Sequence, residues 1–333
     1  MTDNYFLAGD IGGTKTTLAI FSPAAGLRAP LTERTFRSAA FPNLAAIVRE
    51  FLAQATISVR RAYFGVAGPV VLGKAAVTNL SWHISERELA AAFHFEQVTL
   101  LNDLVAIANA VPVLQANDLH TLNAGSPVPG GAMAVVAPGT GLGEAYLTWD
   151  GQAYHAYASE GGHTDFAPTD AQEMALLRYL QKKFGRVSYE RICSGIGLPN
   201  IYAFLKDIGF APEPDWLAAE LAAVPDPNPI LVRYALENPA KCPLCTETLR
   251  LFVSVLGAEA GNMALKVLAS GGVYLGGGIP PRILPLLTGE TFMHPFANKG
   301  RFADMLRRFP VHVILNRRAA LLGAARYGLR KMQ

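Results

Sequence analysis

The chain of 333 residues is long enough for two domains with substantial hydrophobic cores. Hydrophobic residues make up 51% of it and charged residues 17%, which excludes a largely disordered protein. The formal net charge is only +3, so the composition gives no reason to expect nucleic acid or an anionic membrane as a partner.

The first predicted element is a glycine-rich hairpin near the N-terminus. A strand over residues 5–8 leads into the turn Gly9–Thr14, and β-branched and aromatic residues predict a second strand over residues 16–21. The spacing of apolar residues then predicts a helix over 43–55, with Asn43 as its cap. A buried strand is expected over 62–71, broken at Gly68-Pro69.

A second strand and a second glycine hairpin follow. The strand 97–101 runs into Asn102-Asp103, and a helix begins at once over 104–109. Residues 115–131, rich in Asn, Gly and Pro, are expected to form a loop-bearing crossover. Strands over 133–137 and 144–149 flank the turn 138–143.

The C-terminal half is predominantly helical in its apolar spacing. Residues 170–270 predict helices, interrupted by a proline-rich surface segment over 212–229, and 247–269 predict one long helix. A strand then leads into the turn Gly276–Gly278, with Pro280 at an early helical position, and a last helix covers 319–331. Hairpins and alternating helices in two halves predict an α/β protein with two lobes.

Glycine loops of this kind can bind phosphate through backbone amides. A Walker A loop is excluded, because the sixth position from Gly9 is Thr14 and the chain continues as a strand. A dinucleotide fingerprint is excluded as well, because residues 139–143 also open a strand rather than a helix. The remaining pattern, two glycine hairpins and a late glycine turn, resembles the actin/hexokinase/heat-shock-70 ATPase superfamily. In that superfamily the two hairpins hold the polyphosphate and the later turn holds the adenosine.

Phosphoryl transfer to a sugar needs a base, a cation on the phosphates and groups that hold the sugar. Asp103 is the best candidate base, because it follows a strand at the edge where α/β sheets place ligands. The alternative is that it only caps the following helix. Glu160 and His163 flank two glycines and could both bind sugar hydroxyls. Glu190 offers another carboxylate, with a surface helix glutamate as the alternative.

Seven segments make the resemblance more specific. They are similar to the bacterial glucokinase family, in order and over nearly the whole chain. The resemblance implies the two-lobed actin-like ATPase (ribonuclease-H-like) fold, with ATP and sugar in the interlobe cleft. It places a small lobe at 1–107 plus 317–333 and a large lobe at 108–316. The segments are GDIGGTKTTLAIF, LLNDLVAIANAVP, APGTGLGEAYL, SEGGHTDFAP, ERICSGIGLPNIY, GGVYLGGGIPPRI and LNRRAALLGAARYGL.

The same resemblance implies roles for individual residues. Asp103 matches the general base of the family, and Asp10 would lie near the Mg²⁺ that accompanies ATP, directly or through water. The implied glucose ligands are Asn102, Asp103, Glu160, His163 and Glu190. The implied nucleotide ligands are Gly9, Asp10, Ile11, Gly12, Gly13 and Thr14 in the first loop, Thr140 and Gly141 in the second, and Gly277 and Gly278 in the adenosine turn.

The implied reaction transfers the γ-phosphoryl of MgATP to the 6-hydroxyl of glucose, the first step of glycolysis. The family likeness also implies a homodimer, and three cysteines without a membrane-length apolar run favour the cytoplasm. The residues leave three alternatives open: another hexose or N-acetylhexosamine as substrate, ADP or polyphosphate as donor, and a non-catalytic sugar-sensing or protein-binding ATPase. Zinc is disfavoured, because only one closely spaced cysteine pair, Cys242 and Cys245, follows His163, and structural zinc takes four ligands.

Overall fold

The computed structural model describes residues 4–77 and 80–332, and the chain divides into two compact units. The first unit comprises residues 1–116, 150–158 and 316–333, and the second comprises 117–149 and 159–315. Each unit contains a β-sheet with helices, so the expected α/β class is confirmed. None of the helices in the described part of the chain is long and apolar enough to cross a membrane.

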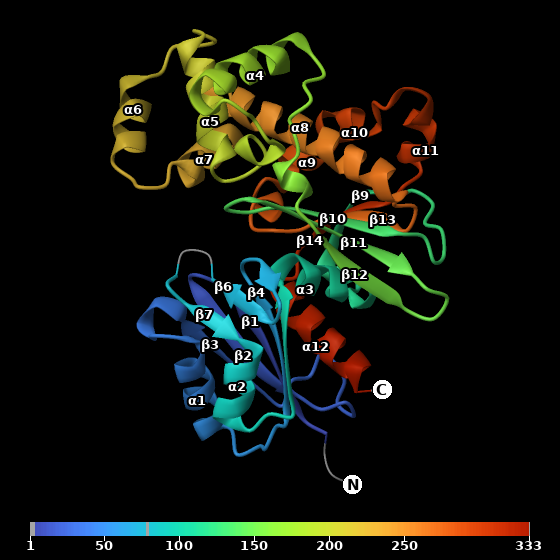
Figure 1. The fold of residues 1–333 in the computed structure, drawn as a ribbon. Helices are drawn as coiled ribbons and strands as arrows, with labels where there is room; N and C mark the ends of the chain where they lie inside the picture. Colours follow the sequence, from blue (N-terminus) through green and yellow to red (C-terminus); the bar gives the residue numbers. More distant parts are fainter. Residues whose placement is uncertain (1–3, 78–79, 333) are drawn as a thin grey trace. The chain divides into compact units, whose positions relative to one another are not determined.

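The first unit is built on a five-stranded sheet of order β3-β2-β1-β4-β8 (Figure 1). β1 and β2 form an antiparallel hairpin, whereas β1, β4 and β8 run parallel. The register pairs Asp10 with Gly65 and Gly65 with Leu101, so Asp10 and the residues after Leu101 lie at the same sheet edge. The strands are β1 (Phe6–Ile11), β2 (Lys15–Phe21), β3 (Thr32–Arg37), β4 (Arg61–Val66) and β8 (Gln97–Asn102).

Helices and a small second sheet complete the first unit. α12 packs against α3 so closely that a Cβ at Gly323 would lie 1.7 Å from the carbonyl oxygen of Ala106. Asn43 caps α1 as expected, because its Oδ1 accepts a hydrogen bond from the Ala46 N–H at 2.9 Å. The helices are α1 (Leu44–Gln54), α2 (Glu86–Phe93), α3 (Asp103–Ala110) and α12 (Ala319–Lys331), and the small sheet consists of β5 (Val70–Val71), β6 (Lys74–Ala76) and β7 (His83–Ser85).

The second sheet has six strands in the order β12-β11-β10-β13-β14-β9. β10 and β11 form the second glycine hairpin, and β13 runs parallel to β10. The turn after β13 therefore emerges at the same edge as the β10–β11 turn. The strands are β9 (Leu119–Asn123), β10 (Met133–Pro138), β11 (Leu142–Trp149), β12 (Tyr154–Ser159), β13 (Gly272–Leu275) and β14 (Val311–Ile314).

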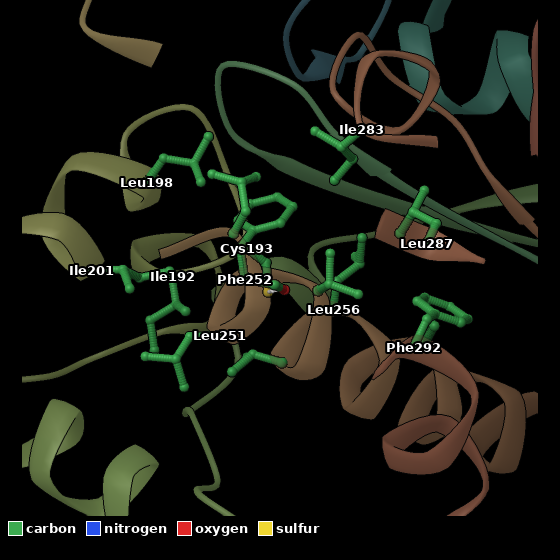
Figure 2. Packing of buried hydrophobic residues seen from close by; sticks show 14 of the residues in the cluster. Ile192, Cys193, Leu198, Ile201, Leu251, Phe252, Leu256, Ile283, Leu287 and Phe292 are labelled. Carbon is green, nitrogen blue, oxygen red and sulfur yellow. Dashed lines mark hydrogen bonds between the residues drawn. The ribbon is translucent and has the colours of Figure 1, made fainter. Parts of the chain in front are cut away.

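The core of the second unit surrounds the long helix α8 (Pro243–Val267). Figure 2 shows Cys193 beside Phe252, with Leu251 and Leu256 of the same helix close by. α8 also packs on α10, where a Cβ at Gly257 would lie 2.4 Å from the Phe292 carbonyl oxygen. The other helices are α4 (Ala171–Phe184), α5 (Gly197–Asp207), α6 (Asp215–Ala222), α7 (Asn228–Glu237), α9 (Leu284–Leu287), α10 (Glu290–Ala297) and α11 (Ala303–Arg307).

The structure differs from the sequence-based expectation at three places. β1 continues to Ile11, so the first turn is shorter than Gly9–Thr14 and Gly9 lies inside a strand. A Cβ there would lie 2.7 Å from side-chain atoms of Leu18 and Phe64, so close packing requires this glycine. The expected crossover 115–131 contains β9, which gains its order by pairing with β14. The expected proline-rich surface segment contains α6, which buries Leu217 in the core.

Candidate active site

The first glycine hairpin of the first unit is held by hydrogen bonds from outside its own turn. Within the turn, the Gly12 N–H donates to the Lys15 carbonyl oxygen at 3.0 Å. The buried Ser38 hydroxyl donates to the Gly12 carbonyl oxygen at 2.7 Å and lies 3.0 Å from the Thr16 hydroxyl. The Ser38 N–H donates to the Thr14 carbonyl oxygen at 3.1 Å. Ser38 thus fixes the loop shape, a role that sequence reasoning did not assign.

Asp10 and Asp103 are electrostatic neighbours at the edge of the first sheet. Burial and, to a smaller extent, the negative charge of Asp103 together raise the pKa of Asp10 to about 6. Two carboxyl groups that disfavour each other's ionisation form a site that a cation would stabilise. The neighbouring Ile11 side chain is completely buried, so only the backbone of this residue could contact a ligand.

Asn102, rather than Asp103, caps helix α3. Its Oδ1 accepts hydrogen bonds from the N–H groups of Leu104 at 2.9 Å and Val105 at 3.4 Å. Its side-chain amide donates to the Gly68 carbonyl oxygen at 3.1 Å. Asp103 is the first helical residue, and its Oδ1 accepts from the Leu104 N–H at 3.0 Å. Asn102 thus occupies the cap position, and Asp103 supplies a second acceptor for the Leu104 N–H.

The second glycine hairpin and the Glu190 turn are joined in the second unit. Glu190 lies in the short 3-10 helix Tyr189–Arg191, and its Oε2 accepts from the Leu142 N–H at 3.0 Å. A Cβ at Gly141 would lie 2.4 Å from the same oxygen. The loop is closed by the Gly139 N–H, which donates to the Gly141 carbonyl oxygen at 2.8 Å, and Thr140 is exposed. The Glu190 carboxylate therefore packs against the loop itself.

The Glu160–His163 segment forms a tight turn beside this hairpin. His163 Nδ1 lies 3.8 Å from Glu190 Oε1, so the structure brings these two predicted sugar ligands together. The Glu160 side chain is exposed, and its carbonyl oxygen accepts from the His163 N–H at 3.0 Å. A Cβ at Gly162 would lie 2.1 Å from the Leu142 carbonyl oxygen, which explains why this turn contains glycine. The turn therefore packs against the backbone at the start of β11.

The late glycine turn packs on the base of the second hairpin. Gly277 has a φ of +80°, and a Cβ there would lie 2.4 Å from the Pro138 carbonyl oxygen. Gly278, in contrast, faces open space, and Pro280 begins a 3-10 helix as expected for a proline at an N-terminal helical position.

A cavity of about 790 Å³ opens at this turn within the second unit. It is bounded by both glycine turns and by α7, which supplies Arg233, while Arg282 approaches from the 3-10 helix. Asn228 at the start of α7 donates from Nδ2 to the Gly195 carbonyl oxygen at 2.8 Å and so fixes the adjoining loop. Sequence reasoning did not find the α7 residues, because only the fold brings this helix to the glycine turns.

Among residues 4–77 and 80–332, no group of three or more His, Cys, Asp or Glu side chains is arranged to hold a metal ion. Cys242 and Cys245 are buried thiols of the second core. Mg²⁺ bound with a nucleotide usually takes one or two protein carboxylates, with phosphate and water oxygens completing its shell. The partly buried Asp10 beside Asp103 fits that donor set.

Comparison with known proteins identifies the family. The glucokinase family model matches residues 7–331. The chain belongs to the glucokinase family. It is 41% identical to a glucokinase of Nostoc punctiforme, over 96% of this chain and 97% of the relative. It is also 34% identical to a glucokinase of Yersinia pestis, over 98% of this chain and 97% of that one.

Solved structures agree with this membership of the glucokinase family. The chain is similar to a glucokinase from an Antarctic psychrotroph, with a TM-score of 0.84, 33% identity and coverage of 98% of this chain and 99% of that one. A glucokinase from Streptomyces griseus, solved with glucose and AMPPNP, has a TM-score of 0.62 at 19% identity, over 97% and 98% of the two chains. At that identity the likeness shows the fold alone, which is the actin-like ATPase fold of sugar kinases.

Proposed function

We propose that this protein is a glucokinase that transfers the γ-phosphoryl group of MgATP to the 6-hydroxyl of glucose. One structural observation supports the assignment of the catalytic base. Asn102 already caps α3, and the position of Asp103 at the carboxyl edge of the sheet, beside Asp10, supports a further role for Asp103. A base for the sugar hydroxyl is the role that this edge of an α/β sheet favours. Membership of the glucokinase family supports the same assignment.

In the proposed reaction, Asp103 accepts the proton of the 6-hydroxyl as that oxygen attacks the γ-phosphorus. Asn102, Glu160, His163 and Glu190 hold the other hydroxyls. A sugar that lacks one such hydroxyl leaves a buried polar group unpaired, which costs roughly 1–3 kcal/mol of binding. Positioning and charge neutralisation supply most of the rate enhancement, because the transition state of phosphoryl transfer is loose.

The glycine loops are assigned to the nucleotide. The backbone of residues 9–14 and that of Thr140 and Gly141 bind the phosphates, and Gly277 and Gly278 bind the adenosine. The cavity beside Gly278 has a volume typical of small-molecule sites, and its lining includes Arg233 and Arg282 as well as Asp226 and Glu237. The Streptomyces griseus relative was solved with the ATP analogue AMPPNP and with glucose, which supports ATP as donor and glucose as acceptor.

Mg²⁺ would be held by Asp10 together with phosphate oxygens, directly or through water. When bound, the ion neutralises charge on the transferring phosphoryl group. We further propose a homodimer that acts in the cytoplasm at the first step of glycolysis. Light scattering of the purified protein tests the dimer, since a monomer mass would contradict it.

A substrate panel tests the proposed function. We expect kcat/KM for glucose with ATP to exceed the values for mannose, fructose and N-acetylglucosamine by at least about tenfold, which corresponds to one lost hydrogen bond. The same assay with ADP and polyphosphate identifies the donor. A higher kcat/KM for N-acetylglucosamine or another hexose would assign a different substrate, and ATP hydrolysis that is unaffected by any sugar would contradict kinase activity.

A further inference from the structure

Two glutamates outside the proposed site are completely buried in the second unit. Glu144 on β11 is 1% exposed and Glu259 on α8 is 0% exposed. Glu259 is the neighbouring charged group that acts most strongly on Glu144. No described residue gives either oxygen of Glu144 a hydrogen-bond partner. Burying two neighbouring ionised carboxylates costs folding free energy, unless one of them is protonated.

The burial of these two interacting carboxyl groups favours a proton on one of them. Two ionised carboxylates could only accept hydrogen bonds, whereas a protonated one could also donate. Glu259 has the partners of a charged group, because its Oε2 accepts from Asn262 Nδ2 at 2.9 Å and its Oε1 lies 3.7 Å from Lys266 Nζ. Glu144 has no such partners within the described part of the chain. The proton therefore belongs on Glu144, because an ionised carboxylate without partners would be costly in this core, and the protonated group could donate to Glu259.

The charged and titratable groups around the pair agree with this assignment. Burial and the neighbouring Glu259 raise the pKa of Glu144 to about 8, while the positive charge of Lys266 on α8 has a smaller, opposite effect. Burial and Glu259 also raise the pKa of Tyr189, and burial with Glu259, Glu173 and Glu144 raises that of Cys193, so both remain protonated. Lys299 faces Glu259 as well; burial lowers its pKa.

The pair lies directly against the backbone of the proposed sugar site. A Cβ at Gly161, the residue after Glu160, would lie 1.8 Å from Glu144 Oε2. On the other side, Asn262 Nδ2 donates both to Glu259 and to the Tyr189 hydroxyl, at 2.9 Å each. Tyr189 immediately precedes Glu190. The two carboxyl groups thus connect to the Glu160 turn directly and to the Glu190 turn through Asn262 and Tyr189.

We propose that Glu144 is a positioning residue for the sugar, whose protonated carboxyl, beside Glu259, holds the Gly161 backbone and the Glu160–His163 turn in their binding geometry. The inference rests on the proposed sugar role of that turn. Loss of the proton would leave two negative charges in contact within a low-dielectric core. The carboxyl groups would then separate, and because Gly161 has no free space beside Glu144, the turn would move with them. Sugar binding should therefore weaken in alkaline solution.

The Glu144→Gln variant tests this inference, because its amide can donate to Glu259 at every pH without a titratable proton. In the unmodified protein we expect the KM for glucose to rise roughly tenfold between pH 7 and pH 9, as a group with a pKa near 8 loses its proton. In the variant the KM should stay nearly constant, and the KM for ATP should respond equally in both proteins. The same rise in the KM for glucose in both proteins would overturn the positioning role.

Thermal unfolding tests the shared proton without any sugar. The unfolded Glu144 ionises near pH 4.5 while the folded one keeps its proton to about pH 8, so the stability of the unmodified protein falls with rising pH across that window. The Tm of Glu144→Gln relative to the unmodified protein should increase by roughly 5–10 °C from pH 5 to pH 8 and then stay level. Glu160→Gln, an exposed control, should show no such trend.

The pH dependence of the KM for glucose and that of the Tm distinguish failure of the protonated pair from failure of the proposed function. A Tm difference independent of pH would overturn the shared proton itself. A pH-dependent Tm difference in a protein that phosphorylates no sugar would overturn the proposed function and leave the protonated pair standing. If Glu144→Gln does not fold, Glu259→Gln replaces it, because removal of the Glu259 charge lowers the pKa of Glu144. Both pH profiles should then shift to lower pH, and unshifted profiles would overturn the interaction of the pair.

Discussion

The Glu190 carboxylate accepts a hydrogen bond from the Leu142 N–H at 3.0 Å, which joins a proposed sugar ligand to the proposed second phosphate loop. The same oxygen fills the space beside Gly141, where a Cβ would lie 2.4 Å away. A substitution of Glu190 should therefore weaken the binding of both glucose and ATP. A substitution of a residue that contacts only the sugar should weaken the binding of glucose alone.

We expect Glu190→Ala to raise the KM for glucose and for ATP by roughly tenfold each, because it removes a charged hydrogen-bond acceptor from both sites. Glu160→Gln is the matched control, since among the described residues its side chain is not bonded to the loop 139–141. It should raise the KM for glucose alone. Steady-state kinetics with each substrate varied in turn checks this, and an unchanged KM for ATP in Glu190→Ala would contradict the coupling.

Asp103 and Asn102 should separate chemistry from stability. Asp103→Asn removes the base but leaves the cap of α3 in place, so kcat should fall about 10²–10⁴-fold while glucose binding and Tm change little. Asn102→Ala removes the cap and should lower the free energy of unfolding by about 0.5–2 kcal/mol. Kinetics, glucose titration calorimetry and denaturant unfolding of both variants check these effects. Near-normal turnover in Asp103→Asn would show that another group is the base.

Ser38 is expected to support the first phosphate loop. Ser38→Ala removes the hydrogen bond to the Gly12 carbonyl oxygen and leaves the buried Thr16 hydroxyl without its partner, so the KM for ATP should rise several-fold. Thr35→Ala removes a comparable but exposed bond to Thr17 on the neighbouring strands and should change neither KM. Equal effects of the two substitutions on the KM for ATP would argue against a specific role for Ser38.

The two glycines of the adenosine turn should respond differently to alanine. Gly277→Ala places a Cβ 2.4 Å from the Pro138 carbonyl oxygen at a φ of +80°, a strain of about 1–3 kcal/mol or more, so Tm should fall by several degrees. Gly278→Ala meets open space beside the cavity, so Tm should hold while the KM for ATP rises. Differential scanning fluorimetry with ATP kinetics distinguishes them, and equal loss of Tm in both would refute this account of the turn.

Much of the fold and of the site is readable from the sequence because it depends on local patterns. The hairpins, the α1 cap at Asn43 and the last helix over Ala319–Lys331 follow from glycine turns, capping chemistry and apolar spacing. The strand β9 was missed because its order comes from pairing with β14, almost 190 residues away. Ser38 and the Glu144–Glu259 pair were missed for the same reason, since their partners are distant in sequence and near only in the fold.

The central claim is tested most directly by ³¹P NMR of glucose mixed with MgATP and the purified protein. The account predicts one glucose 6-phosphate for each ATP consumed, and little inorganic phosphate when glucose is left out. Inorganic phosphate released at the same rate with and without glucose, or a phosphorylated product other than glucose 6-phosphate, would contradict it.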